Sequence, residues 1–272
     1  MLASCSRVRF ADIFPRSAPV IGVIHLLPLP GYPASPGLAA VVAHALADLK
    51  ALIGGGVDGV LVENDGDQPH TVTASPGTIA CMTRITLDLI DAAGDVPVGV
   101  EILLNDPQAS LAVAHAAGAR FIRTDYFVDR MTRPEYGGEM TIDPAGLMAY
   151  RERLGARDVL VLADIQVKHA RMIEPRSLAE SAAAARQHGA DGIIVTGDLT
   201  GLPPGAVDLD TARLGAGPVP VIVGSGLDEA NATGLMATAD GAIVGTSVKT
   251  GAAVDMEKVR RLMDRVRAAH GA

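Results

Sequence analysis

The chain of 272 residues has few aromatic side chains, which make up 3% of the sequence, and it has no tryptophan. It also has little positive charge, because 23 Lys and Arg stand against 31 Asp and Glu, a formal net charge of −8. Proteins that bind nucleic acid use basic patches and stacking rings, so we expect no nucleic-acid partner. Hydrophobic residues make up 49% of the chain, which is too apolar for a disordered protein.

Cysteine and long apolar runs are also scarce. Cys5 and Cys81 lie far apart, show no CxxC spacing and cannot build a disulfide framework, which favours a reducing cytoplasm. The apolar runs are about as long as strands, well short of the roughly 18 residues that span a bilayer, and no signal-peptide core is evident. We therefore expect a cytoplasmic protein without a transmembrane segment.

Short apolar runs rich in β-branched residues recur along the chain. They are continuous instead of alternating, as expected of parallel strands that are covered on both faces. Eight such runs predict strands: Val20–Ile24, Gly59–Val62, Val98–Leu103, Phe121–Thr124, Val159–Ala163, Gly192–Thr196, Val219–Val223 and Ala242–Val244.

Helical stretches separate these runs, and several begin after a capping Asp or Ser and end at a Gly. They are Leu38–Ile53, Thr78–Ala93, Pro107–Ala117, Pro144–Leu154, Ser177–His188, Asp208–Leu214, Glu229–Ala237 and Met256–Ala269. A phrase such as Gly-Val-Asp-Gly-Val (residues 56–60) or Gly-Ala-Asp-Gly-Ile (residues 189–193) recurs where a helix ends and a strand begins.

The repeated units predict an α/β fold, a single (β/α)8 TIM barrel over residues 1–272, with residues 1–18 as a lead-in segment. The alternative is an open doubly wound sheet, which usually carries a Gly-rich fingerprint after its first strand. Here the first strand ends in His25-Leu-Leu-Pro-Leu-Pro30, which cannot cradle a pyrophosphate, and the sequence contains no GxGxxG.

The active site of such a barrel lies at the carboxyl ends of its strands, and there the sequence gathers acidic groups. Carboxylates near one barrel axis repel each other, so they need a cation nearby, or one of them keeps a proton and can act as a general acid or base. Arg123 and Lys168 are the expected counter-charges, and a divalent cation such as Mg²⁺ on Asp125 and Asp164 is an alternative. The acidic groups are Glu63, Glu101, Asp125 and Asp164.

Other polar residues at strand ends complete the expected site. His25 follows the first strand and is a candidate for acid–base catalysis or for ligand binding, as is His169. Lys168 could pair with a carboxylate or a phosphate, or form a Schiff base. We expect catalytic roles for Glu101, Asp125, Asp164, Lys168 and His25, and substrate contacts from Glu63, Asn64, Arg123, His169 and Thr196.

Two Gly-rich turns follow the last two strands: Gly224-Ser225-Gly226 and Gly245-Thr246-Ser247. Their backbone N–H groups and hydroxyls can bind a phosphate, and barrels often place a phosphate site in these two loops. The sequence therefore predicts a phosphorylated small-molecule ligand. Lys249 could add a charge to this site or lie in solvent at the start of a helix.

Several motifs together resemble the BtpA family over nearly the whole chain. The most specific are His25–Gly31 (His-Leu-Leu-Pro-Leu-Pro-Gly) and Val167–Ala170 (Val-Lys-His-Ala). Further matches are Val57–Asn64, Pro97–Val100, Leu104–Asp106, Phe121–Arg123, Ala163–Asp164, Gly224–Gly226 and Asp240–Ser247.

The resemblance implies a TIM barrel of the ribulose-phosphate-binding type. One family member is associated with photosystem I biogenesis in cyanobacteria, and SgcQ-like members are described as nucleosidases or sugar-phosphate enzymes. This chain departs from the family pattern at three places. It has Gln166 in place of His and Glu101 in place of Asn, and its fourth strand ends in Thr124-Asp125-Tyr126 where a Val-Asn type of ending is expected. The two added carboxylates suit a cationic or oxocarbenium-like centre.

We therefore expect an enzyme that acts on a phosphorylated sugar or ribosyl compound. Cleavage at the anomeric carbon and isomerisation through an enediol both suit the carboxylates, so a nucleosidase and a sugar-phosphate isomerase or lyase both stay open. The alternative is a noncatalytic assembly factor of the photosystem I biogenesis type. A homo-oligomer is expected, with residues 28–36 and 126–138 as contacts or, for the second loop, a lid.

Overall fold

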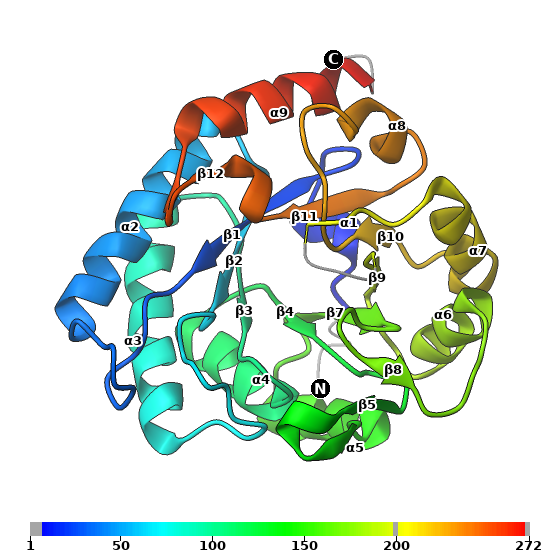
Figure 1. The fold of residues 1–272 in the computed structure, drawn as a ribbon, viewed down its shortest axis with the longest axis horizontal. Helices are drawn as coiled ribbons and strands as arrows, with labels where there is room; N and C mark the ends of the chain where they lie inside the picture. The colour runs from blue at the N-terminus through cyan, green and yellow to red at the C-terminus, as the bar shows by residue number, and fades with distance from the viewer. Residues whose placement is uncertain (1–6, 198–200, 270–272) are drawn as a thin grey trace, which may run out of the picture.

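Eight parallel strands close into a barrel in the computed structural model, which describes residues 7–197 and 201–269 (Figure 1). Neighbouring strands in the barrel follow the order β1-β2-β3-β4-β7-β9-β10-β11, and β11 pairs back with β1. The expected single TIM barrel is confirmed. The strands are β1 Val20–His25, β2 Gly59–Glu63, β3 Val98–Glu101, β4 Phe121–Thr124, β7 Leu160–Ile165, β9 Gly192–Val195, β10 Val221–Val223 and β11 Gly241–Val244.

Helices between the strands form the outer ring, as the sequence predicts. They are α2 Leu38–Gly55, α3 Pro76–Ala93, α4 Pro107–Ala117, α5 Pro144–Leu154, α6 Leu178–Gln187, α7 Ala206–Ala216, α8 Ala232–Met236 and α9 Met256–Ala269. Helix α8 is shorter than the predicted Glu229–Ala237, because Asp228 accepts the amides of Ala230 and Asn231 in a turn that delays the helix.

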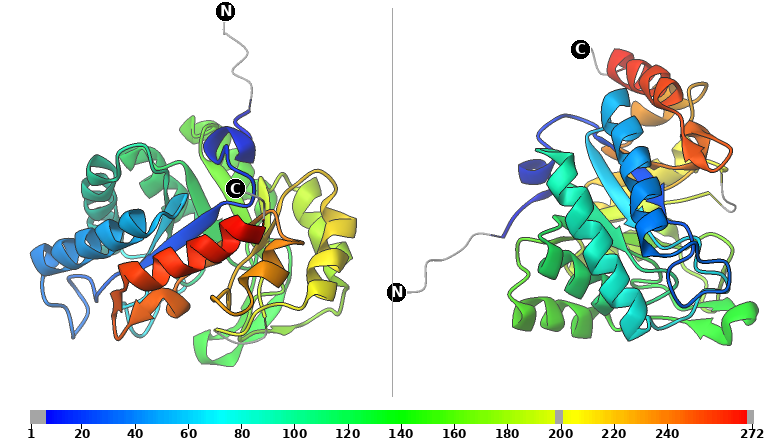
Figure 2. Two further views of the ribbon diagram at one scale, coloured as in Figure 1. Left: turned by 90° about the horizontal axis from the view of Figure 1, so that it is seen from above. Right: turned by 90° about the vertical axis from the view of Figure 1, so that its left-hand side faces the viewer.

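Short elements close the two ends of the barrel. Helix α1 (Phe10–Ile13) lies at the amino end, and Figure 2 shows it opposite a small sheet at the carboxyl end. That sheet has three strands in the order β6-β5-β8: β5 Met131–Arg133, β6 Gly138–Met140 and β8 Arg171–Met172. The short helix η1 Pro134–Tyr136 connects β5 to β6. The segment 126–138, for which the sequence left a contact or a lid open, therefore carries strand β5 of this sheet. A second addition, η2 Thr246–Val248 with the hairpin β12 Lys249–Thr250 and β13 Ala253–Val254, precedes α9.

The lower half of the barrel interior is filled with apolar side chains. Phe14, at the end of α1, packs edge-on against Phe121, with ring centroids 5.6 Å apart. Gly99 leaves room for the Phe121 ring, since a Cβ there would lie 2.1 Å from it. The cluster contains Phe14, Ile21, Val23, Leu61, Phe121, Leu160, Leu162, Ile194, Ile222 and Ile243. Because this half is a packed core, ligands have access only to the upper half.

The recurring Asp of the helix-to-strand phrase ties each strand to its neighbour. Asp58 accepts the amide of Val20, Asp191 that of Val161 and Asp240 that of Val221, at 3.0, 2.9 and 2.8 Å. The amide of each Asp in turn donates to the carbonyl of the same neighbouring residue. The phrase is thus a repeated structural device at the amino end of the barrel, remote from the carboxyl ends.

Helix α2 is the one helix of the described residues that is long and apolar enough to cross a membrane, by length and composition alone. It is amphipathic in place, with Val41, Ala45, Leu49 and Leu52 buried, and it contacts β1, α3 and α9. A helix that covers a barrel meets the same criterion, so its apolar residues are explained by this packing.

Candidate active site

Alternation along the strands brings polar side chains into the upper half of the barrel. His25 on β1 is level with Glu63 on β2, and Glu63 is level with Glu101 on β3. Each lies two residues beyond a small or apolar interior position (Val23, Leu61 and Gly99), so the same face that forms the lower core becomes charged at the mouth. Three adjacent strands thus present an imidazole and two carboxyl groups in one row.

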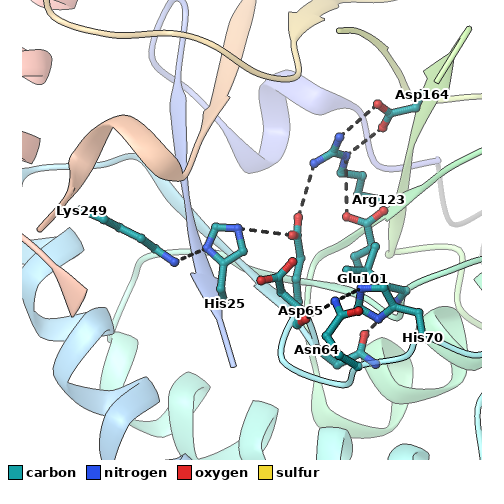
Figure 3. A network of polar contacts seen from close by, with 11 residues as sticks. His25, Asn64, Asp65, His70, Glu101, Arg123, Asp164 and Lys249 are labelled. Carbon is teal, nitrogen blue, oxygen red and sulfur yellow. Dashed lines mark hydrogen bonds and ion pairs between the residues drawn. The ribbon is translucent and has the colours of Figure 1, made fainter. Parts of the chain in front are cut away.

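Arg123 on β4 is the centre of the charged cluster (Figure 3). Its Nε and Nη2 donate to the two carboxylate oxygens of Asp164, at 2.8 and 3.0 Å, and its Nη1 donates to Glu63 at 3.3 Å. Glu101 Oε2 lies 3.6 Å from Nε. Burial alone would lower the pKa of Arg123, but these carboxylates outweigh it and raise the pKa well above its usual range. The predicted counter-charge role of Arg123 toward the carboxylates is what the structure shows.

Glu63, Glu101 and Asp125 differ in the direction in which the site moves their pKa or in its extent. Burial, with Glu63 and Asp125 nearby, raises the pKa of Glu101 well above its usual range. Burial would also raise the pKa of Glu63, but Arg123 and His25 outweigh it and hold that pKa below its usual value. Glu63 and Glu101 are hydrogen bonded to each other, so the acid form of Glu101 donates to the Glu63 carboxylate.

Asp125, just beyond β4, titrates in the physiological range. Burial and the negative charge of Asp164 raise its pKa to about 7, against the opposite effect of Arg123 and Lys168. A group with such a pKa can both accept and release a proton at neutral pH, as a general acid or base must. The cluster therefore combines a carboxyl group that favours its protonated form (Glu101), one that favours its ionised form (Glu63) and one that can exchange a proton near neutral pH (Asp125).

His25 lies on the other side of Glu63, with its Nε2 3.8 Å from Glu63 Oε2. Its Nδ1 is hydrogen bonded to the Nζ of Lys249, which reaches it from β12. Lys249 therefore does not stand in solvent at a helix start, and it lines neither cavity described below. Its role as a phosphate partner is not supported by this placement.

Lys168 is carried by a backbone loop with two residues in the left-handed region, Gln166 (φ 48°) and His169 (φ 63°). The buried carboxylate of Asp129 holds this loop, because it accepts the Gln166 amide at 2.9 Å and the Ser181 hydroxyl at 2.7 Å. Lys168 is half-buried and makes no ion pair within 4.0 Å with any residue of the described ranges. Its ammonium group is thus available to a ligand.

Two cavities meet at this cluster. The first, the glycine lobe, has a volume of about 180 Å³ and lies under the loops after β10 and β11. The second, the outer lobe, has a volume of about 330 Å³ and lies under the β5–β6–β8 sheet. Both lobes share the walls His25, Glu63, Arg123 and Lys168. The predicted Gly224–Gly226 and Gly245–Ser247 turns line the glycine lobe, and Glu101, Asp125 and His169 line the outer lobe.

In the glycine lobe, backbone amides are better placed than side-chain hydroxyls to donate hydrogen bonds to an anion. The Ser225 and Ser247 hydroxyls already donate to the carbonyls of Leu202 and Leu227. By contrast, the amides of Ser225 and Gly226 donate to no acceptor within the described part of the chain. A Cβ at Gly224 would lie 2.4 Å from Ile194 and 2.5 Å from Thr196, so only glycine fits there.

Two predicted substrate contacts lie elsewhere. Asn64 is 2% exposed, and both ends of its amide hold loops: Oδ1 accepts the Leu103 amide at 2.8 Å and Nδ2 donates to Asp67 at 3.0 Å. Asn64 lines neither lobe, so a substrate-hydroxyl role for it is not supported, because its hydrogen-bonding groups are already used. Thr196 also lines neither lobe, and its Oγ1 has no hydrogen-bond partner among the described residues.

Four polar residues of the outer lobe were not among the predicted site residues. Asp65, His70, Arg133 and Tyr136 line it but come from loops and from the β5–β6 hairpin. Arg133 stacks on the Tyr136 ring, 4.8 Å from the centroid. Asp65 follows β2 by two residues, whereas His70, Arg133 and Tyr136 lie beyond any barrel strand end, and the signal for the last two was the long segment after β4.

The predicted cation site on Asp125 and Asp164 is not a preformed one. No group of three His, Cys, Asp or Glu side chains within residues 7–197 and 201–269 is arranged to hold a metal ion. Both oxygens of Asp164 already accept hydrogen bonds from Arg123, so a cation there would compete with the guanidinium group. The cation role stays a prediction.

Comparison with known sequences gives a family and full-length relatives. A family model described as the BtpA family matches residues 16–268. Photosystem I biogenesis protein BtpA of Synechocystis is 40% identical over 234 residues, which cover 85% of this chain and 80% of the relative. An uncharacterized protein of Archaeoglobus fulgidus is 37% identical over 254 residues, which cover 93% of this chain and 98% of the relative.

Solved structures of low identity share the barrel. Thiamine phosphate pyrophosphorylase from Pyrococcus furiosus superposes with a TM-score of 0.61 at 16% identity, covering 93% of this chain and 97% of its own. N-(5'-phosphoribosyl)anthranilate isomerase from the same organism gives a TM-score of 0.56 at 15% identity, covering 92% and 99%. At these identities the likeness shows the fold alone.

Proposed function

The chain belongs to the BtpA family, and we propose that it is an enzyme that acts on a phosphorylated sugar or ribosyl compound. One observation carries this proposal: the glycine lobe adjoins the lobe that holds the carboxyl cluster, since His25, Glu63, Arg123 and Lys168 line both. A ligand with its phosphate in the glycine lobe would place its sugar carbons beside groups that can exchange protons.

The glycine lobe is proposed as the phosphate site. It offers the amides of Ser225 and Gly226, which have no acceptor among the described residues, and Lys168, which has no ion-pair partner among them, lies in its wall. Backbone amides and a Lys point charge are a common pair of phosphate ligands. Two structural neighbours are named for phosphate-bearing substrates, which agrees with this use of the fold.

The carboxyl cluster is proposed as the catalytic centre. Asp125 exchanges a proton with the substrate, Glu101 supplies a protonated carboxyl, and Glu63 and Asp164 keep Arg123 in place. Cleavage at the anomeric carbon and isomerisation through an enediol both need a group that donates a proton and a carboxylate that acts as a base or nucleophile. The proposal includes both reactions, and a bound cation on Asp125 and Asp164 is not required for it.

A noncatalytic assembly factor is the second candidate, because a 40% identical relative is named a photosystem I biogenesis protein. Asp125→Asn separates the two candidates, since it changes one oxygen to nitrogen at the proposed base. Loss of turnover supports the enzyme, and unchanged stabilisation of a partner complex with no turnover in the wild type supports the factor. For either candidate we keep the expectation of a cytoplasmic homo-oligomer.

The binding half of the proposal is tested by thermal unfolding with ribose 5-phosphate, ribose and inorganic phosphate, each with and without Mg²⁺. A ligand present at about 100 times its dissociation constant stabilises the folded state by roughly 2.7 kcal/mol. We expect ribose 5-phosphate to stabilise the protein more than ribose does. If no phosphorylated compound in a broader phosphosugar set changes the midpoint, the proposal is wrong.

A further inference from the structure

His25 is held by a lysine on one side and by a glycine at its edge. The Nζ of Lys249 is hydrogen bonded to Nδ1 of the ring (Figure 3). Gly245 leaves room for the ring, because a Cβ there would lie 2.6 Å from His25 Cε1. The ring therefore has one orientation, with Nε2 turned toward Glu63 and toward the junction of the two lobes.

The hydrogen bond determines which ring nitrogen carries the proton. An ammonium group has three donors and no acceptor, so Nδ1 must accept, and a neutral ring then keeps its single proton on Nε2. Glu63 Oε2 lies 3.8 Å from Nε2, too far to take that proton in a hydrogen bond. The Nε2–H group is left free to donate into the cavity.

The position of Lys249 is built into the fold. Lys249 pairs with Val254 in the β12–β13 hairpin, and the Val254 amide donates to the buried Asp48 at 2.9 Å. The ammonium group of Lys258 donates to the Lys249 carbonyl at 2.6 Å. The hairpin is thus fixed to both α2 and α9, and the Lys249 side chain extends from it to the barrel mouth.

Burial and nearby charges act on the pKa of both groups. Burial lowers the pKa of Lys249 below its usual value, although the carboxylates of Asp48, Asp65 and Glu63 favour its ammonium form. Burial also lowers the pKa of His25, and Lys249 and Lys168 lower it further against the effect of Glu63 and Asp65. The lysine thus repels a second proton on the ring.

We propose that Lys249 is a positioning residue that fixes His25 as a neutral hydrogen-bond donor, with Nε2–H aimed at a substrate oxygen where the lobes meet. The substrate role rests on the proposed function, whereas the tautomer does not. His25 then polarises a carbonyl or hydroxyl oxygen and does not remove protons, which leaves the base role to the carboxyl cluster. From the sequence alone, His25 could serve in acid–base catalysis or in ligand binding, and the proposal restricts it to the donation of a hydrogen bond.

The tautomer is measured directly by long-range ¹H–¹⁵N NMR on the uniformly ¹⁵N-labelled full chain, without any ligand, with His25→Gln used for assignment. We expect Nδ1 at the shift of an unprotonated nitrogen and Nε2 at the shift of a protonated one. Lys249→Met removes the donor but keeps the stem, and it is expected to release the tautomer and to raise the His25 titration midpoint. Lys249→Arg should preserve the wild-type pattern, and Lys50→Met, an exposed site on α2, is the charge-matched control.

Two outcomes would overturn the proposal: a proton on Nδ1 in the wild type, or an unchanged tautomer in Lys249→Met. Where turnover is detected, His25→Gln keeps a side-chain N–H donor and His25→Phe does not. We expect His25→Phe to lose about a hundredfold or more in kcat and His25→Gln to lose less, because removal of one such donor has an effect of that order. Equal losses contradict the donor role. If no substrate is found but the tautomer is as stated, the proposed function fails and Lys249 keeps its positioning role.

Discussion

Arg123 and Asp164 form a bidentate ion pair inside the barrel, with both carboxylate oxygens bonded to the guanidinium at 2.8 and 3.0 Å. Asp164 is fully buried, and the Arg123 side chain is 7% exposed. The pair is thus largely shielded from bulk water, although Arg123 lines both lobes. The charged site is therefore part of the stability of the barrel as well as of its chemistry.

Arg123→Met is expected to destabilise the fold by about 3–5 kcal/mol, the usual effect of removing one partner of a buried ion pair. The loss follows from leaving Asp164 buried without a cation. Denaturant unfolding measures it, and Arg84→Met is the matched control, since Arg84 is 57% exposed and pairs with Asp88 on the surface of α3. The control should change stability by less than about 1 kcal/mol. If both variants lost a similar free energy of unfolding, the buried ion pair would contribute no more to stability than the exposed one.

Asp125→Asn is expected to change how stability depends on pH. The pKa of Asp125 is raised to about 7 in the folded protein, so the folded state binds a proton that the unfolded state releases near pH 4. Wild-type stability therefore falls relative to the variant as the pH rises from about 4 to about 7, and the difference is constant above. At pH 8 the variant should be more stable by at least about 1.4 kcal/mol, the equivalent of one pKa unit.

Urea unfolding of both proteins at pH 4, 6 and 8 measures this difference. Asp91→Asn, at an exposed position of α3, is the control and should show no gain at pH 8. A gain for Asp125→Asn that is the same at pH 4 and pH 8 would contradict the raised pKa.

The barrel strands were predictable because a parallel strand buried on both faces is a continuous apolar run. β4 has the predicted bounds, and β1 extends one residue beyond them, to His25. β3 stops at Glu101, before the predicted Leu103, since the Leu103 amide bonds to the Asn64 side chain instead of continuing the ladder. The inward-facing polar residues at the strand ends followed from the same alternation.

The rest of the site depends on contacts that no local pattern encodes. The strands β5, β6 and β8 have only two or three residues each, too short to show a period, so the cover over the outer lobe was not predictable. The partner of His25 is Lys249, 224 positions away, brought there by a hairpin that is anchored on Asp48. Asn64 was misjudged because a polar residue at a strand end can hold a loop as readily as a ligand.

Lys168→Met is expected to weaken the binding of phosphorylated ligands selectively. A hydrogen bond to a charged group contributes about 1.5–3 kcal/mol, so the dissociation constant for ribose 5-phosphate should rise roughly tenfold to a hundredfold. Ribose, which lacks the phosphate, should show no comparable change. Isothermal titration measures both, with Lys50→Met as the control of equal charge. An equal loss for ribose and ribose 5-phosphate would place Lys168 at the sugar and not at the phosphate.

Asp191→Ala is expected to destabilise the barrel far more than Asp240→Ala, although the two residues occupy equivalent places in the repeated phrase. Each accepts a strand amide, from Val161 or Val221. Asp191 also forms an ion pair of 3.1 Å with Arg151, and this pair is buried, with side chains 7% and 3% exposed. Asp240 pairs with Arg213 at the surface, where the two side chains are 40% and 38% exposed. Removing Asp191 leaves a buried guanidinium without a counter-charge, a loss of about 3–5 kcal/mol, whereas removing Asp240 loses mainly one hydrogen bond, about 1 kcal/mol.

Chemical denaturation of both variants measures the difference, and the double variant Asp191→Ala with Arg151→Met should recover part of the loss. Equal losses for the two single variants would show that the strand amide, and not the buried arginine, determines the contribution of this Asp.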